Sequence, residues 1–169
     1  MSSGAQGKDL SHVGSDGMPR MVDVGHKSST MRVARAQACV HLPLDVAAQF
    51  EGGELSTKKG PVVQTAIIAG TMAAKKTSEL IPFCHPLAIE RCKFTSELDS
   101  GTLRIECEVG LNGKTGVEME ALTGASVAAL TVYDMLKALS HDLVIGDVRL
   151  LSKTGGKSDF NADAQTGAK

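Results

Sequence analysis

An acid and an amine stand three positions apart in a stretch of the sequence that is otherwise mostly apolar. Asp134 and Lys137 lie within residues 116–140, which contain no proline and few polar side chains. If this stretch is a helix, the two side chains share one face, and a carboxylate beside an amine can exchange protons with a bound substrate. An ordinary ion pair on a helix surface is the competing interpretation, and such pairs are frequent. Asp134 and Lys137 are therefore candidate catalytic residues, with that simpler role as the alternative.

A second candidate is a short loop that carries a thiol and an imidazole between two prolines. Residues 81–87 read Ile-Pro-Phe-Cys-His-Pro-Leu, and each proline fixes its own φ and restrains the residue before it. A stiff loop can present Cys84 and His85 to a ligand, although proline-rich connections also occur for structural reasons alone. Because these two residues are adjacent and no other Cys/His pair has the usual ligand spacing, we expect no metal site.

Two turns look like the end of a phosphate-binding P-loop without meeting its requirements. Residues 113–115 and 156–158 each read Gly-Lys followed by Thr or Ser, but Glu108 and Leu151 stand where the first glycine of that motif is needed. Each turn is either a plain connection or a local anion site, and the first stands before a predicted helix, which would favour an anion. Further basic residues are either solvated or gathered round a phosphate group in the folded chain. These are Arg32, Arg35, Lys58, Lys59, Lys75, Lys76, Lys153 and Lys157.

Hydrophobic periodicity predicts the elements that must position these residues. Apolar and polar residues alternate over 34–42 and 103–111, which indicates strands with one buried face. Residues 116–140 are too long and too apolar for a strand and indicate a buried helix, whose outer side we expect subunit association to cover. The remaining predicted elements are a short helix at 43–50, a helix at 61–73, a strand at 87–98, a turn at 99–101 and a last strand at 143–151. This βαββαβ order is typical of an α+β ferredoxin-like fold, in which helices pack on one face of an antiparallel sheet.

Composition restricts the class of protein. The 169 residues are 42% hydrophobic and 22% charged, which fits one globular domain. With 18 basic and 19 acidic residues there is no global field to attract nucleic acid or an anionic membrane, and no apolar run reaches the roughly 18 residues that a membrane span needs. Four irregularly spaced cysteines without a secretory signal predict free thiols in the cytoplasm. We expect a leader without fixed structure at 1–20, a single domain at 21–160 and a flexible tail at 161–169.

Several motifs in a fixed order together carry a family resemblance. They lie at residues 21–24, 75–77, 80–86, 113–122, 133–135 and 153–158. Over 21–160 the chain resembles the molybdenum cofactor biosynthesis protein C family, the cyclic pyranopterin monophosphate synthases. The resemblance implies a ferredoxin-like fold, a homohexamer built as a trimer of dimers, and a lyase that converts 3′,8-cyclo-7,8-dihydro-GTP to cyclic pyranopterin monophosphate and pyrophosphate. The implied reaction requires no redox cofactor and is compatible with a magnesium ion bound through the substrate triphosphate.

The resemblance also assigns roles by position. Asp134 matches the family's active-site residue and Lys137 its catalytic lysine. The substrate-binding and other functional polar positions match Phe83, Cys84, His85, Met119, Glu120, Arg32, Lys59, Lys75, Glu118, Lys153 and, as a looser match, Lys157. Phe83 departs from the leucine that the family commonly has; a backbone contact would survive this change, whereas a tight side-chain pocket would be reshaped.

The spacing of two of these residues predicts a site shared between subunits. Glu120 and Asp134 are separated by fourteen positions, which is about 21 Å along one helix. The copies in one chain cannot both flank a small reacting centre, so we expect each active site to combine segments from two subunits.

A non-catalytic nucleotide- or RNA-binding module with a ferredoxin-like fold is the alternative function. Such a sheet usually needs exposed aromatic side chains on which bases stack. The chain has no Trp, one Tyr and four Phe, and only Phe94 falls on a predicted strand. The enzyme is therefore the favoured interpretation.

Overall fold

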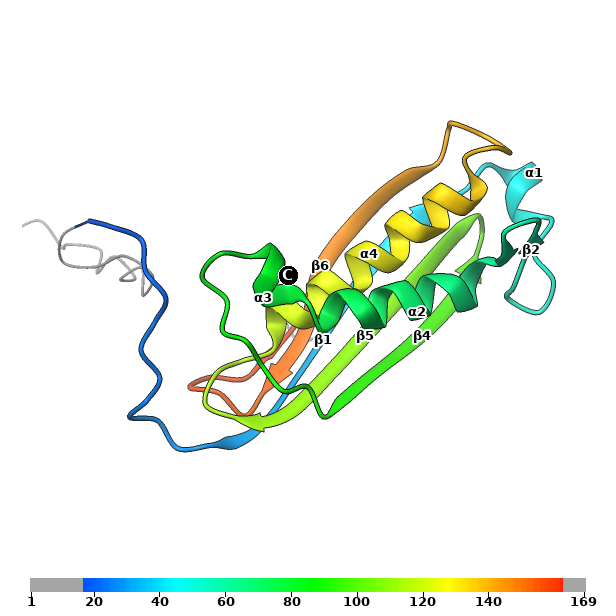
Figure 1. Ribbon diagram of the computed structural model, residues 1–169. Coiled ribbons are helices and arrows are strands. Elements are labelled where there is room, and N and C mark those ends of the chain that lie inside the picture. The colour runs from blue at the N-terminus through cyan, green and yellow to red at the C-terminus, as the bar shows by residue number, and fades with distance from the viewer. Residues whose placement is uncertain (1–16, 163–169) are drawn as a thin grey trace, which may run out of the picture.

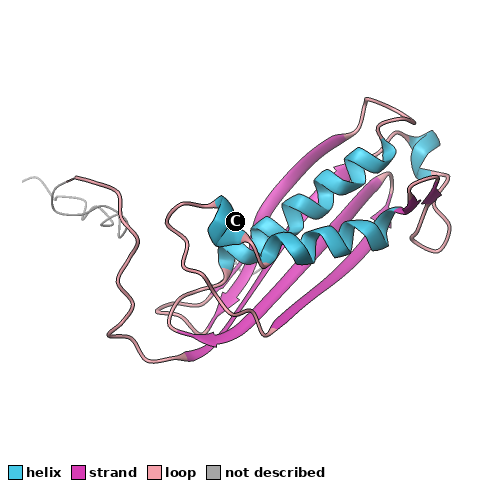
Figure 2. Ribbon diagram, viewed as in Figure 1, coloured by secondary structure: helices cyan, strands magenta, loops and turns pink. Residues whose placement is uncertain are grey.

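The computed structural model describes residues 17–162, and the fold is built from two long helices and a twisted sheet (Figures 1 and 2). Residues 1–16 of the predicted leader and 163–169 of the predicted tail lie outside the described part. The elements in chain order are β1 (Thr30–His41), α1 (Leu44–Ala47), β2 (Ser56–Thr57), β3 (Gly60–Pro61), α2 (Val62–Ala74), α3 (Thr77–Leu80), β4 (Arg91–Asp99), β5 (Thr102–Gly113), α4 (Glu118–Leu136), β6 (Val144–Thr154) and β7 (Phe160–Asn161).

The sheet confirms the predicted fold class. Its five strands have the order β4-β5-β1-β6-β7, and every neighbouring pair is antiparallel. The four long strands and the helices α2 and α4 follow the βαββαβ order, and both helices cover the same face of the sheet (Figure 1). The described residues contain no helix that is long and apolar enough to cross a membrane.

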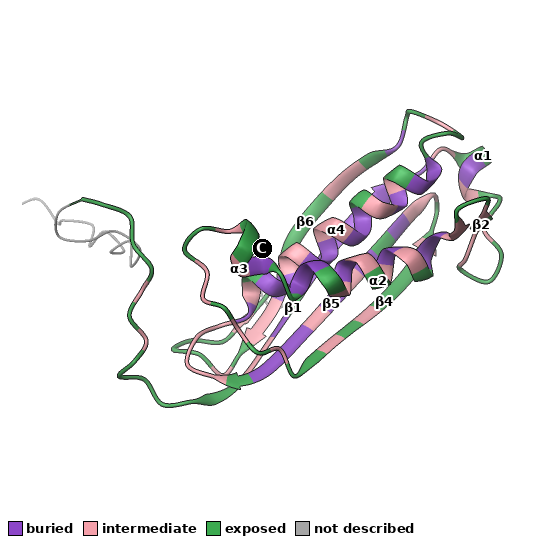
Figure 3. Ribbon diagram, viewed as in Figure 1, coloured by how far each residue is buried: buried purple, intermediate pink, exposed green. Residues whose placement is uncertain are grey.

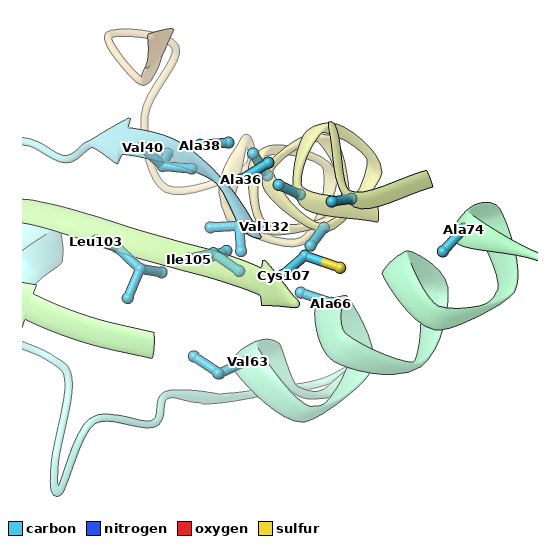
Figure 4. Close-up of a cluster of buried hydrophobic side chains, with 14 of the residues drawn as sticks. Ala36, Ala38, Val40, Val63, Ala66, Ala74, Leu103, Ile105, Cys107 and Val132 are labelled. Atoms are coloured by element: carbon cyan, nitrogen blue, oxygen red, sulfur yellow. The ribbon is translucent and has the colours of Figure 1, made fainter. Parts of the chain in front are cut away.

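The core lies between the sheet and these two helices (Figures 3 and 4). The strand β1 contributes Ala34, Ala36, Ala38 and Val40, all at most 1% exposed. Because alanine side chains are short, α4 packs close to the strands, and the larger buried residues of β5 fill the remaining space. Each fully buried aliphatic side chain of this kind contributes about 1.5–3 kcal/mol.

A pair of glycines lets the two helices touch. A Cβ placed on Gly70 of α2 would lie 2.7 Å from the backbone oxygen of Gly124 in α4 and 2.7 Å from the ring of Phe94 in β4. These separations are shorter than van der Waals contact, so an alanine at Gly70 would push α2 away from both neighbours. The contact fixes the height of α2 above the edge of the sheet.

Element boundaries differ from the prediction in ways that have local causes. The strand expected at 87–98 begins only at Arg91, because residues 81–90 form the proline-containing loop. The helix expected at 116–140 runs from Glu118 to Leu136 and is followed by a turn. The short elements β2, β3, α3 and β7 were not predicted, since two to four residues carry no readable periodicity.

Candidate active site

A groove of about 710 Å³ opens at the end of the molecule where α4 begins. Five segments distant in sequence line it: the stretch before β1, the start of β1, the loop 81–87, the turn that leads into α4, and the end of β6 with the turn after it. The predicted site residues that the structure brings together here are Arg32, Phe83, Cys84, His85, Glu118, Met119, Glu120, Lys153 and Lys157.

Glu120 is the buried acid of this groove. Its side chain lies in the first turn of α4, and the residue is only 4% exposed. Burial raises the pKa of Glu120 to about 7, and the negative charge of Glu118 adds to the shift, while a hydrogen bond with its own backbone opposes it. Burial and the negative charge of Glu120 also raise the pKa of the Cys84 thiol. The groove therefore contains a carboxyl group that can change protonation state near neutral pH.

The loop with the Cys-His pair is tied to the segment before β1. The imidazole Nε2 of His85 lies 2.8 Å from the backbone oxygen of Val22. Because a carbonyl oxygen only accepts hydrogen bonds, Nε2 carries the proton in this contact, which orients the ring. The ammonium of Lys114, in the turn before α4, donates to the backbone oxygen of Gly25 at 2.7 Å. These two contacts hold residues 22–25 along the groove.

Cations collect where β6 ends. Lys153 pairs with Glu118 at 3.0 Å, and both side chains are about one-third exposed or less. Arg32 donates through Nε to the backbone oxygen of Gly113 at 3.3 Å. Gly155 has φ +81°, and a Cβ there would collide with the backbone of Met31, so the turn after β6 requires glycine to reach this position. The arrangement presents positive side chains beside the buried acid, as an anionic substrate requires.

The other predicted catalytic residues lie at the far end of α4. Lys137 and Lys59 contact the two carboxylate oxygens of Asp134 at 2.7 and 2.9 Å. All three side chains are more than half exposed. The hydrogen bond from Lys137, then that from Lys59, lowers the pKa of Asp134 to about 2, and the pKa of Lys137 is raised by the same contact. We call these three residues the Asp134 cluster.

The structure does not bring Lys75 into either group. It is the residue that ends α2 and is exposed, and it neither lines the groove nor contacts Asp134. Within one subunit the predicted site is thus divided into the groove and the Asp134 cluster, as the spacing of Glu120 and Asp134 predicted.

Sequence reasoning did not include several residues that line the groove among the site residues, such as Val22, Val24, Lys27 and Lys114. The motif at 21–24 supported the family resemblance, but the apolar side chains of Val22 and Val24 gave no sign of chemistry. Lys114 was identified only as part of a turn that was either plain or anion-binding. Among residues 17–162 no group of three or more His, Cys, Asp or Glu side chains could hold a metal ion.

Comparisons with known proteins match most of the chain. The MoaC family model matches residues 21–156. A cyclic pyranopterin monophosphate synthase of Xanthomonas campestris pv. campestris (strain B100) is 57% identical over 90% of this chain and 93% of the relative. A protein of the same name from Desulfitobacterium hafniense is 50% identical over 89% of this chain and 91% of the relative. The molybdenum cofactor biosynthesis protein 1 of Dictyostelium discoideum is 47% identical over 90% of this chain, which corresponds to 27% of that longer protein.

Proposed function

The chain belongs to the MoaC family and is a lyase that makes cyclic pyranopterin monophosphate in molybdenum cofactor biosynthesis, and we propose that it does so where the groove of one subunit meets the Asp134 cluster of another. The substrate is a small molecule, which we propose to be 3′,8-cyclo-7,8-dihydro-GTP, with pyrophosphate as the second product. The free state of Cys39, Cys84, Cys92 and Cys107 agrees with the cytoplasmic location that we propose.

The observation that carries this proposal is the division of the candidate residues between the two ends of α4. The groove has a buried acid and several cations but does not include Asp134 and Lys137, whereas the Asp134 cluster is exposed and lines no part of the groove. One small substrate contacts both sets only if a second subunit supplies the other set. A dimer with two equivalent composite sites satisfies this requirement, and we propose that three such dimers form the homohexamer.

The chemistry gives each set of residues a role. Opening the five-membered ring of the purine and forming a pyrazine ring moves protons between nitrogens and hydroxyl groups, and Lys137 with Asp134 would serve as acid and base for those transfers. Glu120 supplies a further carboxyl group whose protonation changes near neutral pH. As the ribose-derived hydroxyl attacks the innermost phosphorus, the bond to the pyrophosphate leaving group breaks, and cations would stabilise the leaving charge.

The cations proposed to hold the triphosphate come from both subunits. Arg32, Lys153 and Lys157 line the groove itself. Lys59 would arrive with the partner's Asp134 cluster, and Lys75 would join the site only through the assembly. Phe83 and Met119 are exposed at the groove, 39% and 38%, and would pack against the pterin-forming rings. His85 is held by Val22, which leaves Nδ1 as the ring nitrogen free to accept a hydrogen bond from the substrate.

Mixing two inactive variants tests the composite site. Co-refolding an Asp134→Asn chain with a Glu120→Ala chain gives hybrid dimers in which one of the two sites has both intact residues. Random association then restores roughly a quarter of wild-type turnover, measured as pyrophosphate and cyclic phosphate released from 3′,8-cyclo-7,8-dihydro-GTP.

The matched control mixes Asp134→Asn with Lys137→Ala. Both changes lie in the Asp134 cluster, so no arrangement of these two chains produces an intact site, and activity stays at the level of the separate variants. If the first mixture is no more active than its components, each site is built from one subunit. If the wild-type protein forms no product, the proposed reaction itself is wrong.

The structure gives one further reason to prefer the enzyme to an RNA-binding module. Phe94, the aromatic residue that stood on a predicted strand, faces α2, where its ring lies against Gly70. It is therefore not presented on the open face of the sheet, where bases would stack.

A further inference from the structure

Glu54 stands just before the β2–β3 hairpin, and its carboxylate binds backbone groups that follow the hairpin. Oε1 accepts a hydrogen bond from the N–H of Val63 at 2.8 Å, and Oε2 accepts one from the N–H of Gln64 at 3.0 Å. Oε1 also accepts from the N–H of Leu55 at 2.9 Å, which holds the carboxylate in this orientation. A single side chain therefore ties the start of the hairpin to the segment after its end.

The same carboxylate caps the first turn of α2. A helix begins with backbone N–H groups that have no partner within the helix, and Pro61, the residue before α2, has a side chain that cannot accept a hydrogen bond. The N–H of Val62 donates to the backbone oxygen of Leu55 at 3.0 Å, and the next two N–H groups donate to Glu54. Burial alone would raise the pKa of Glu54, but the backbone hydrogen bonds that its carboxylate accepts lower the pKa below its ordinary value. Glu54 is therefore ionised at neutral pH, and its negative charge is favourable at a helix N-terminus.

The β2–β3 hairpin carries Lys59 in its turn. The two strands pair with each other, and residues 58 and 59 connect them. The hydroxyl of Thr57 accepts from the N–H of Lys59 at 3.1 Å and donates to the backbone oxygen of Gly60 at 3.1 Å. An isolated two-stranded hairpin is at best marginally stable in water, and each strand here has two residues. The direction of the hairpin therefore depends on what fixes its base.

From this turn Lys59 contacts the far end of α4, which lies at the same end of the molecule as the hairpin (Figure 1). Its ammonium donates to the carboxylate of Asp134 at 2.9 Å and to the backbone oxygen of the same residue at 3.2 Å. Both side chains are more than half exposed, and an ion pair in water is weak. The pair alone does not fix Lys59, so its position depends on the backbone that carries it.

The helix α2 gives this backbone a fixed base, because α2 packs directly against α4. Gly70 and Gly124 meet where the two helices touch, and a Cβ on Gly70 would lie 2.7 Å from the backbone oxygen of Gly124. A segment bound to the first turn of α2 therefore has a defined position relative to α4. Glu54 provides that binding for the β2–β3 hairpin.

We propose that Glu54 is a positioning residue of the Asp134 cluster: by tying the base of the β2–β3 hairpin to α2, its carboxylate holds Lys59 against Asp134. The inference rests on the proposed function, in which Lys59 and Asp134 take part in the reaction. Because the carboxylate of Glu54 binds backbone N–H groups, it acts on a substrate through Lys59 and not by direct contact.

A role in stability alone is the competing explanation. Capping a helix N-terminus stabilises a protein whether or not the helix leads to a site. The two explanations differ in what the loss of Glu54 does to Lys59. A lost cap lowers the stability of the whole fold, whereas a lost positioning residue moves Lys59 away from Asp134 and leaves Lys137, which lies at the end of α4 itself, in place.

A carbodiimide crosslink measures the position of Lys59 without any substrate. The reagent joins a carboxylate to an amine in contact with it, and Asp134 has two such amines, from Lys59 at 2.9 Å and from Lys137 at 2.7 Å. Mass spectrometry of the digested protein gives the ratio of the two products. Glu54→Gln should lower the ratio of the Lys59 product to the Lys137 product severalfold. An unchanged ratio would overturn the proposal, even if the variant is less stable.

Turnover tests whether this position matters for the reaction. Glu54→Gln should lower kcat/KM for 3′,8-cyclo-7,8-dihydro-GTP by roughly 10- to 100-fold, since a displacement of about 1 Å can have such an effect. Lys59→Ala should lower it at least as far. Adding Glu54→Gln to Lys59→Ala should then cause no further loss, because Glu54 acts through Lys59. Losses that multiply in the double variant would show an independent role and overturn the proposal.

Glu51→Gln is the matched control, because Glu51 is an exposed glutamate of the same loop whose backbone pairs with that of Glu54. It should keep the crosslink ratio and the turnover of the wild type, and an equal change in both variants would contradict the specific role of Glu54. Glu54→Asp retains the negative charge but is one methylene shorter, so it replaces Glu54→Gln if that variant does not fold and should give the same loss of the Lys59 product. An inactive wild type refutes the proposed reaction, whereas the crosslink ratio still decides whether Glu54 holds Lys59.

Discussion

The two ends of α4 hold acidic side chains in opposite surroundings. Glu120, in the first turn, is 4% exposed and has a pKa raised to about 7 by burial. Asp134, near the last turn, is more than half exposed, and hydrogen bonds from Lys137 and Lys59 lower its pKa to about 2. One end therefore has an acid that exchanges its proton near neutral pH, and the other has a fixed anion between two cations.

This difference bears on how an acid–base pair can work here. In the single subunit the Asp134 cluster lies in water, where Asp134 stays ionised and raises the pKa of Lys137. A lysine transfers protons efficiently near neutral pH only when its pKa is lowered, usually by burial or a nearby cation. In the composite site that we propose, the partner's groove would cover the cluster and bring the cations of that groove near Lys137, which would lower the pKa of Lys137. If the composite site is correct, assembly is therefore part of the catalytic mechanism.

The largest expected effect is that of Lys137→Ala on turnover. Loss of a general acid or base reduces the rate by roughly 10²- to 10⁴-fold, whereas the exposed position of Lys137 predicts an unchanged fold. Product formation from 3′,8-cyclo-7,8-dihydro-GTP and the circular dichroism spectrum measure the two quantities. Lys58→Ala is the matched control, because Lys58 is an exposed neighbour of Lys59 and belongs to neither group of site residues. A comparable loss in both variants would show that the region needs only positive charge.

The fold was largely predictable, because the alternation of apolar and polar residues and the length of an apolar segment can both be read from the sequence. The apolar face of β1 and the buried helix α4 follow from the order of alanines, valines and leucines. The starts of α4 and β4 were misplaced, because Gly116-Val117 and Leu87–Glu90 are compatible with regular structure but lie outside the helix and the strand, where Gly116, Val117 and Leu87 line the groove. The local sequence alone does not predict where a loop will contact distant parts of the chain.

The site was predictable only in part for a similar reason. The motifs identified His85 and Glu120, and the helical spacing alone was enough to separate Glu120 from Asp134. The pairing of His85 with the backbone of Val22 could not be foreseen, because it joins residues 63 positions apart through a carbonyl that every residue has. The role expected for Lys75 stays a prediction, since no contact given for residues 17–162 assigns it to either end of α4.

A smaller effect distinguishes the two ends through the pH dependence of stability. The pKa of Glu120 is about 7 in the folded protein and 4.5 in the absence of the fold, so the folded state binds this proton more tightly. The stabilisation is present below pH 4.5 and is lost as the pH rises through 7. Relative to Glu120→Gln, the wild type should lose about 1–3 kcal/mol of unfolding free energy between pH 4.5 and 8. Urea unfolding at a series of pH values measures the difference.

Glu90→Gln provides the comparison for that titration. Glu90 is an exposed glutamate in the loop before β4, so Glu90→Gln removes a carboxyl group of the same kind from outside the buried site. Parallel curves for Glu120→Gln and the wild type would show that Glu120 is solvated in the free protein, and the contrast between the two ends of α4 would disappear.

The smallest effect is expected from Asp134→Asn on folding. A lowered pKa means that the ionised Asp134 contributes stability above about pH 4, which is lost only as the pH falls towards 2. Since water screens all three side chains of the Asp134 cluster, the urea midpoint of the variant at pH 7 should be indistinguishable from that of the wild type, while its turnover falls. A clear decrease of the midpoint at pH 7 that grows with protein concentration would show that the subunit contact proposed for the cluster also stabilises the assembly. A decrease independent of concentration would contradict the exposed position of the cluster, because only a desolvated ion pair stabilises a single subunit that strongly.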